Sequence, residues 1–233
     1  TAINKTLFAT STDDLRPAMT GVFFELDKNG IQFVATDAHR LVRYKRKDAQ
    51  ATGGDNFIVP RKPLNLLKSA LPDNDDIITL NYNTNHFFVT HGTTRLSCRL
   101  IDARFPDYKV VIPTENPYRL TVIRTEFLGA LRRVSVFSNK STYQVALTIS
   151  GSELQLAAQD VDFSFEGNER MKCQYNGEDL QIAFNAKFLI EMLNSTHSEE
   201  VYLELSTPTK AGLIKPVEQD ESEELLMLVM PLM

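Results

Sequence analysis

The chain has 233 residues, 42% hydrophobic and 24% charged, which is typical of a folded globular protein with one large or two small cores. No window approaches the roughly 18 uninterrupted apolar residues of a membrane span. The formal net charge of −5 excludes a uniformly basic surface that would bind nucleic acid, but it is compatible with one locally basic face. The two cysteines, Cys98 and Cys173, lie far apart without metal-ligand spacing, which indicates buried, reduced thiols in a cytoplasmic protein.

The first half of the chain reads mainly as strands. The N-terminus lacks a signal-peptide pattern, and residues 7–9 read as the end of a helix whose start is missing, which suggests a piece of a longer chain. Residues 21–26 and 31–35 then alternate around the turn residues 27–30 and predict a hairpin. Residues 42–45 predict a third strand.

A helix and a three-strand meander follow. The short apolar run 57–60 precedes Leu64, Leu67 and Leu71, whose spacing predicts a helix with Pro63 in its first turn. Residues 72–75 end that helix. The meander strands are then expected at 77–82, 86–90 and 94–99, and the prolines of residues 113–117 predict a domain boundary.

The second half repeats the first. Residues 22–37 align with residues 145–160 without a gap, and Ile58 matches Ile182 further on. In the helices, Leu64, Leu67 and Leu71 have loose counterparts in Phe188, Met192 and Leu193. Repetition at this period indicates two copies of one domain, residues 1–116 and 117–233. The fold class is α+β, with helices packed on one face of antiparallel sheets.

One turn, Thr36-Asp-Ala-His-Arg-Leu41, places an imidazole, a guanidinium and a leucine side by side. One hypothesis is catalytic: Asp37 and His39 would form the proton-handling pair of a small hydrolase. The other is a recognition surface, an apolar contact rimmed by donors. The chain has no G-x-S-x-G motif and no glycine-rich phosphate loop, and His86 and His91 lack metal-ligand spacing.

The internal repeat distinguishes Asp37 from His39, because only one of them recurs in the second copy. Asp37 recurs as Asp160, whereas the position equivalent to His39 holds Asp162. A shared aspartate most simply closes the turn in both copies through its side chain. The His39-Arg40-Leu41 run is what the first copy adds, and this favours recognition.

Four stretches in this order resemble bacterial DNA sliding clamps, the beta subunit of DNA polymerase III. They are the turn at residues 36–41, Phe57-Ile-Val-Pro-Arg-Lys62, Asp102-Ala-Arg-Phe-Pro-Asp-Tyr108 and Val229-Met-Pro231. The resemblance covers essentially the whole chain, as the second and third of the family's three domains. Two residues depart from the family pattern: Ala38 replaces the usual glycine, so the turn should not need a positive φ, and Val110 stands where some members carry arginine.

The resemblance implies a fold and a function. Two tandem clamp domains would place antiparallel sheets outside and helices on the inner face of a ring that two full-length chains close around double-stranded DNA. The chain would be a non-enzymatic processivity factor, without cofactor or metal, that tethers the replicative polymerase to DNA. The DNA polymerase III catalytic subunit, the clamp loader, other polymerases and repair proteins would dock short motifs in a hydrophobic groove between the two domains. Alone, these two domains should be monomeric or weakly self-associated.

The resemblance also implies two sets of site residues. The peptide-binding set is Met19, Thr36, His39, Arg40, Leu41, Pro106, Val110, Val111, Thr142, Asn185, Phe188, Thr209, Ala211, Leu228, Val229, Met230, Pro231 and Leu232. Its aliphatic members would form a plastic slot, with His39 and Arg40 as donors at the rim. The DNA-binding set is Arg16, Lys68, Arg132, Arg133 and Lys187, which would contact phosphates without reading bases.

Simpler interpretations stay open for both sets. The tail residues 228–230 would also be explained by a last strand that closes a sheet, and the basic residues by ordinary solvated charges. A generic two-domain interaction scaffold is a further alternative to the clamp.

Overall fold

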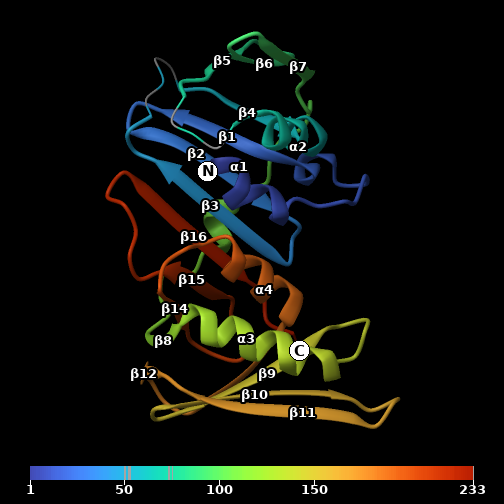
Figure 1. Cartoon of the computed structure of the whole chain (residues 1–233), viewed down its shortest axis with the longest axis vertical. Helices are drawn as coiled ribbons and strands as arrows, with labels where there is room; N and C mark the ends of the chain where they lie inside the picture. The colour runs from blue at the N-terminus through green and yellow to red at the C-terminus, as the bar shows by residue number, and fades with distance from the viewer. Residues whose placement is uncertain (50, 52–53, 73, 75, 233) are drawn as a thin grey trace. The chain divides into compact units, whose positions relative to one another are not determined.

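The computed structural model describes residues 1–49, 51, 54–72, 74 and 76–232 (Figure 1). These residues form two compact units. The first comprises Thr1–Asp107 and Glu221–Glu224, and the second comprises Tyr108–Asp220 and residues 225–232. No helix in the described part of the chain is long and apolar enough to cross a membrane.

The first unit consists of short helices and two antiparallel sheets. Its helical elements are α1 Ala2–Thr6, η1 Leu7–Ala9, η2 Pro17–Thr20 and α2 Arg61–Ala70. Its strands are β1 Gly21–Asp27, β2 Gly30–Thr36, β3 Arg40–Arg46, β4 Asn56–Pro60, β5 Thr79–Tyr82, β6 His86–His91 and β7 Thr94–Arg99. The sheet orders are β3-β2-β1-β4 and β5-β6-β7. The predicted hairpin and meander are both confirmed.

Aromatic residues from alternate strand positions fill the core of this unit. The Phe24 ring on β1 lies 4.8 Å from Phe33 and 5.4 Å from Phe57, between ring centroids, and 5.6 Å from Phe87. Aromatic pairs at this spacing add to the free energy gained by burying their area. Helix α2 closes the core with Leu64 and Leu67, both buried.

Leu71, expected as the third apolar residue of that helix, adopts an extended conformation one residue past its end. Of the residues predicted to end the helix, 73 and 75 lie outside the described part of the chain.

The second unit has the same plan with two additional strands. Its helical elements are η3 Tyr108–Val111, α3 Arg124–Val134, η4 Ser135–Phe137 and α4 Ala186–Asn194. Its strands are β8 Tyr118–Ile123, β9 Gln144–Ser150, β10 Glu153–Asp160, β11 Phe165–Lys172, β12 Gln174–Asn176, β13 Leu180–Asn185, β14 Glu200–Leu205, β15 Gly212–Pro216 and β16 Glu223–Val229, of which the first two residues are assigned to the first unit. The sheet orders are β11-β10-β9-β13 and β12-β8-β14-β15-β16. Helix α3 packs against α4 and against β10 and β11.

The sheet registers confirm the repeat and correct two of its details. Phe24 pairs with Phe33 in the first unit as Leu147 pairs with Leu156 in the second, in the predicted alignment. The counterpart of Ile182, however, is Phe57 and not Ile58, because Phe57 pairs with Phe24 and Ile182 with Leu147. The isoleucine match in the sequence is one residue out of register.

The helix counterparts shift accordingly. Leu64 and Leu189 both occupy the fourth position of their helices, and both are buried. Phe188, the predicted counterpart of Leu64, is only half-buried. It is therefore available for another role.

The connector belongs to the second unit. The side-chain amide of Asn116 donates to the carbonyl oxygens of Glu204 at 3.0 Å and Ala211 at 2.9 Å. The division between the units accordingly falls after Asp107, ahead of the boundary expected at residue 116. The prolines of residues 113–117 lie in an irregular segment, as expected. That segment packs against residues about ninety positions further along the chain, and so it is part of the second unit.

An acidic segment from near the end of the chain, residues 221–224, is tied into the first unit by cations. Lys5 Nζ lies 2.6 Å from one carboxylate oxygen of Glu223, and Arg46 Nη1 lies 3.3 Å from the other. Arg43 pairs with Glu224. We call residues 221–224 the acidic segment.

Acid should weaken this attachment. Burial opposes the ionisation of Glu223, but the hydrogen bond from Lys5 and the positive charges of Lys5 and Arg46 outweigh it and lower the pKa of the carboxyl group. A lowered pKa in the folded state means stability that is present above the unfolded value of about 4.3 and is lost as pH falls through the folded value. We expect Glu223→Gln to reduce the free energy of unfolding by about 1–2 kcal/mol at pH 7 and by much less at pH 3.5, measured by urea titration.

Glu221→Gln is the control for this prediction, because Glu221 is exposed. It should leave the free energy of unfolding within about 0.5 kcal/mol of the wild type at both pH values. An equal effect of Glu223→Gln at pH 7 and pH 3.5 would contradict the assignment.

Candidate functional site

The turn between β2 and β3 is braced by its own side chains. Thr36 Oγ1 donates to the carbonyl oxygen of Arg40 at 2.7 Å. One carboxylate oxygen of Asp37 accepts the backbone N–H groups of His39 and Arg40, each at 3.0 Å. Asp37 therefore closes the turn, as the repeat predicted.

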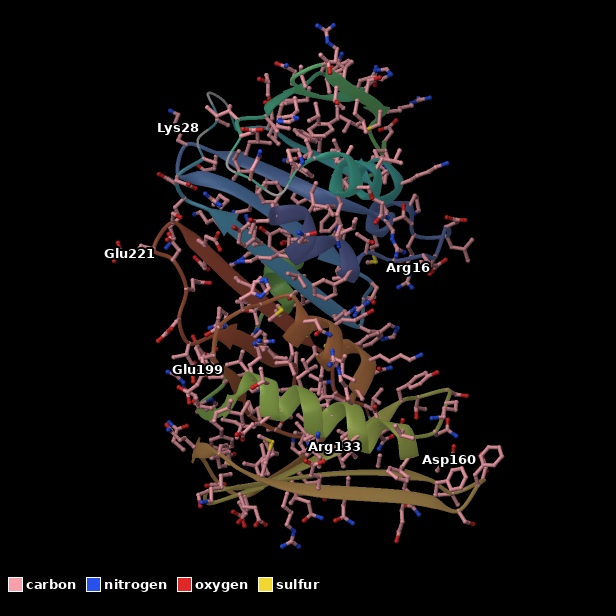
Figure 2. The ribbon with its side chains drawn as sticks, viewed as in Figure 1. Arg16, Lys28, Arg133, Asp160, Glu199 and Glu221 are labelled. Atoms are coloured by element: carbon pink, nitrogen blue, oxygen red, sulfur yellow. The ribbon has the colours of Figure 1, made fainter. Side chains whose placement is uncertain are left out.

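The second copy uses its aspartate in a similar way. Asp160, labelled at the end of β10 in Figure 2, is buried and accepts the backbone N–H of Asp162 at 3.2 Å. The shared aspartate is a structural feature of both copies.

The expectation that Ala38 would avoid a positive φ is wrong, since its φ is 77°. Thr36 pairs with Leu41 across the two strands, so the residues between them must reverse the chain within a tight loop. The left-handed backbone conformation of Ala38 reverses the chain, and the hydrogen bonds to the side chains of Thr36 and Asp37 stabilise that conformation.

Ala38→Gly should therefore stabilise the protein. A left-handed alanine costs about 1 kcal/mol that glycine avoids, although glycine is more flexible in the unfolded chain. We expect a net gain of about 0.5 kcal/mol in the free energy of unfolding, measured by thermal and urea unfolding. The control is Ala157→Gly on β10, where φ is not positive and glycine should cost about 0.5–1 kcal/mol. Destabilisation by Ala38→Gly would contradict the proposed strain.

Arg40 is an internal brace and not an exposed donor. The residue is only 7% exposed. Its Nε donates to Asp37 Oδ2 at 3.0 Å, its Nη2 donates to the carbonyl oxygen of Phe8 at 2.8 Å, and its guanidinium lies over the Phe8 ring. The expectation that Arg40 stands at a rim is therefore wrong within the first unit, whereas His39 is exposed.

This geometry argues against the catalytic hypothesis for the turn. Both carboxylate oxygens of Asp37 accept hydrogen bonds from the turn itself and from Arg40. The Asp37 carboxylate therefore orients backbone N–H groups and a guanidinium. A general base would instead need a carboxylate oxygen directed at the substrate or at an imidazole.

In the second unit, three segments distant in the sequence meet where β13 leads into α4. The backbone N–H of Ala186 donates to the carbonyl oxygen of Tyr143 at 2.8 Å. The side chain of Asn185 caps α4 by accepting the N–H of Lys187 at 3.0 Å. The N–H of Leu232 donates to the carbonyl oxygen of Ala183 at 2.8 Å, which fixes the tail to the edge of β13. We call residues 142–143, 185–188 and 230–232 the α4 corner.

The predicted peptide-binding residues differ in accessibility. In the α4 corner, Thr142 and Met230 are exposed, the latter by 41%, and Asn185, Phe188, Pro231 and Leu232 are half-buried. Elsewhere, Pro106, Val110, Val111 and Thr209 are exposed and Met19 is half-buried. The buried members are Thr36, Arg40, Leu41, Ala211, Leu228 and Val229.

For two tail residues the simpler interpretation holds in the structure. Leu228 and Val229 belong to β16 and pair with Leu213 and Gly212 of β15. Met230 lies beyond the strand and is not needed to close it. Its exposure leaves it available for binding.

The predicted DNA-binding residues are partly neutralised. Arg133 forms two hydrogen bonds with Glu169 of β11, at 2.9 and 2.5 Å, and this contact lowers the pKa of Glu169. Arg16 pairs with Asp13 at 2.8 Å on the exposed loop before η2. Figure 2 labels Arg133 beside α3 and Arg16 on that loop. Arg132 donates to the amide oxygen of Asn194 at 3.1 Å.

The prediction omitted two exposed cations at the start of α2. Arg61 and Lys62 line a cavity of about 350 Å³ together with Ser11, Thr12, Asp14, Thr20, Asn65 and Leu66. The helix carries three cations, including the predicted Lys68, and no acidic residue. The Pro-Arg-Lys sequence after a strand was the available signal, because it places two cations in the first helical turn.

Comparisons with known proteins agree with the architecture. The central-domain model of the DNA polymerase III beta subunit matches residues 1–107, and the C-terminal-domain model matches residues 109–230. The beta sliding clamps of Synechococcus elongatus and Haemophilus influenzae are each 31% identical over 97% of this chain. The chain spans 61% of the length of both relatives.

Solved structures show the same fold. A crystal structure of the DNA polymerase III beta subunit of Pseudomonas aeruginosa has a TM-score of 0.94 and 28% identity, covering 99% of this chain and 62% of that one. The beta subunit of Thermotoga maritima has a TM-score of 0.91 and 29% identity, covering 100% of this chain and 62% of that one. Another Pseudomonas aeruginosa sliding clamp, with a TM-score of 0.92 and 27% identity, was solved bound to griselimycin and covers 99% and 62% of the two chains. The chain belongs to the DNA polymerase III beta subunit family, and it carries that family's central and C-terminal domains.

Proposed function

We propose that this chain is the part of a sliding clamp that docks short linear motifs of replication and repair proteins. The observation that carries the proposal is the α4 corner. Three segments distant in the sequence meet there, and Phe188 and Met230 remain accessible to solvent. Accessible apolar side chains held by a rigid scaffold are suited to accept the leucine or phenylalanine anchors of a peptide.

The proposed peptide-binding residues come from both domains. The first domain contributes the exposed His39 of the braced turn and the half-buried Met19. The second contributes the α4 corner and the exposed valines of η3, Val110 and Val111. The polymerase catalytic subunit, the clamp loader, other polymerases and repair proteins are the proposed partners.

The proposed contact with double-stranded DNA is electrostatic and independent of base sequence. Helix α2 supports it, because Arg61, Lys62 and Lys68 are exposed and the helix has no carboxylate to compensate them. Arg133 is a weaker candidate, since a phosphate would have to displace Glu169. Phosphate contacts of this kind weaken steeply as salt is raised.

The proposed closure of full-length chains into a ring is supported by an open sheet edge. Strand β11 is at the edge of its four-stranded sheet. Exposed apolar side chains gather beside it: Val161, Phe163 and Phe165 at one end, with Val136 and Phe137 of η4. Phe163 and Phe165 stack at 6.1 Å between ring centroids. An open edge with exposed aromatic residues favours pairing with another chain.

Titration of a fluorescent Gln-Leu-Ser-Leu-Phe peptide tests the proposed function. We expect saturable binding in the micromolar range, and competition by the same peptide without a label. A peptide with both leucines and the phenylalanine replaced by serine is the matched control and should not compete. Absence of saturable binding, or equal competition by the control peptide, would refute the peptide-docking function.

A further inference from the structure

Lys187 is held over an aromatic ring at the α4 corner. Its Nζ lies 3.4 Å from the centroid of the Tyr143 ring, a close cation–π contact. The backbone of Tyr143 is held at this place, because its N–H donates to the carbonyl oxygen of Asn139 at 2.9 Å and its own carbonyl oxygen accepts the N–H of Ala186 at 2.8 Å. The ammonium group therefore lies over the Tyr143 ring at the α4 corner.

Besides Lys187, three lysines in the described part of the chain lie near tyrosine rings, namely Lys5, Lys109 and Lys215. Lys5 and Lys215 also pair with carboxylates. Lys5 lies 4.8 Å from the Tyr44 ring centroid and 2.6 Å from Glu223. Lys215 lies 5.9 Å from the Tyr202 ring centroid and 2.8 Å from Glu204. Lysine, tyrosine and carboxylate thus occur together at two places in this protein.

At the α4 corner the lysine and tyrosine are present, but no described residue pairs a carboxylate with Lys187. The nearest cation along the chain on the Tyr143 side, Lys140, donates to the carbonyl oxygen of Val136 at 2.9 Å. An ammonium group on a ring keeps N–H donors directed away from that ring, and a carboxylate is their strongest common acceptor.

We propose that Lys187, positioned by Tyr143, binds an acidic side chain of the docked peptide and so determines which motifs the site prefers. The inference rests on the proposed peptide-docking function and adds charge selectivity to it. Lys187 is the only charged residue among those of the α4 corner, with Glu191 one turn further along α4, and a single cation suits one peptide carboxylate better than a row of phosphates. The exposed cations of α2, by contrast, lie close together in the sequence, as repeated phosphate contacts require.

The test uses matched peptides built on Gln-Leu-x-Leu-Phe. An aspartate or an asparagine is placed before the glutamine, at x, or after the phenylalanine, which gives three acid–amide pairs. At 50 mM salt, wild-type protein should bind the acidic member of at least one pair about three- to fivefold more tightly, as expected for an exposed ion pair. Lys187→Met should reduce that ratio to about one, because it weakens the acidic peptide more than its amide counterpart.

Charge reversal and a distant lysine provide the controls. Lys187→Glu should make a peptide with lysine at the selective position bind more tightly than its aspartate counterpart. Lys68→Met, a change at an exposed lysine of α2, should preserve the wild-type ratio.

Each contrary outcome has a distinct meaning. Equal affinities for all three pairs in the wild type, or a ratio unchanged by Lys187→Met, would overturn the inference while leaving peptide docking intact. Weaker binding of a 20-base-pair duplex by Lys187→Met, with the acidic preference retained, would overturn it in favour of a phosphate contact. Failure of every peptide to bind would refute the proposed function together with this inference.

Discussion

Replacing Arg40 with alanine is expected to destabilise the first unit by about 3–5 kcal/mol. The guanidinium is buried and donates to both the carboxylate of Asp37 and the carbonyl oxygen of Phe8. Its removal leaves the half-buried carboxylate of Asp37 and a backbone acceptor with fewer donors, and the desolvation cost of those groups is no longer offset. Hydrogen exchange of β2 and β3 amides, measured by mass spectrometry, would locate the loss in the first unit.

Arg16→Ala is the matched control, because Arg16 also pairs with an aspartate three residues away but at an exposed site. It should change the free energy of unfolding by less than about 0.5 kcal/mol. Equal effects of the two substitutions would contradict the internal role of Arg40.

This difference determines how peptide binding should be probed. Loss of binding by Arg40→Ala would report a disrupted turn and not a lost contact with the peptide. His39 is exposed on the same turn, so His39→Ala tests recognition without removing the brace.

Met230→Asp is expected to weaken peptide binding by at least about tenfold, or 1.4 kcal/mol. Met230 is exposed beyond β16, so a carboxylate there should not disturb the fold but would be desolvated by an apolar anchor. Fluorescence anisotropy with the Gln-Leu-Ser-Leu-Phe peptide measures the effect, and the thermal midpoint should change by less than about 2 °C.

Two further variants define the site. Phe188→Ala should weaken binding by a similar factor, because the ring is half-buried at the α4 corner. Phe163→Ala removes an exposed ring at the far end of β10 and should leave the affinity unchanged. Equal affinity of wild type and Met230→Asp would exclude the tail from the peptide site.

The sequence by itself determined the local structure and the repeat. Alternation of apolar residues in residues 21–26 and 31–35, together with Gly30, predicted a hairpin that forms with Gly30 at a φ of 135°. A carbon atom added at Gly30 would lie 2.3 Å from the carbonyl oxygen of Arg46, so the glycine is required there. Periodicity and turn chemistry are properties of short segments, which is why they can be read from sequence.

The tertiary structure decided which polar residues are exposed and which segments meet. His39 and Arg40 are adjacent in sequence, yet one faces solvent and the other pairs with Asp37 inside the unit. From the sequence alone, Lys187 is one more solvated cation. In the structure its ammonium group lies over the ring of Tyr143, which belongs to another segment. Ion pairs and ring contacts depend on residues brought together by folding, and a sequence pattern of a few residues contains no information about such distant partners.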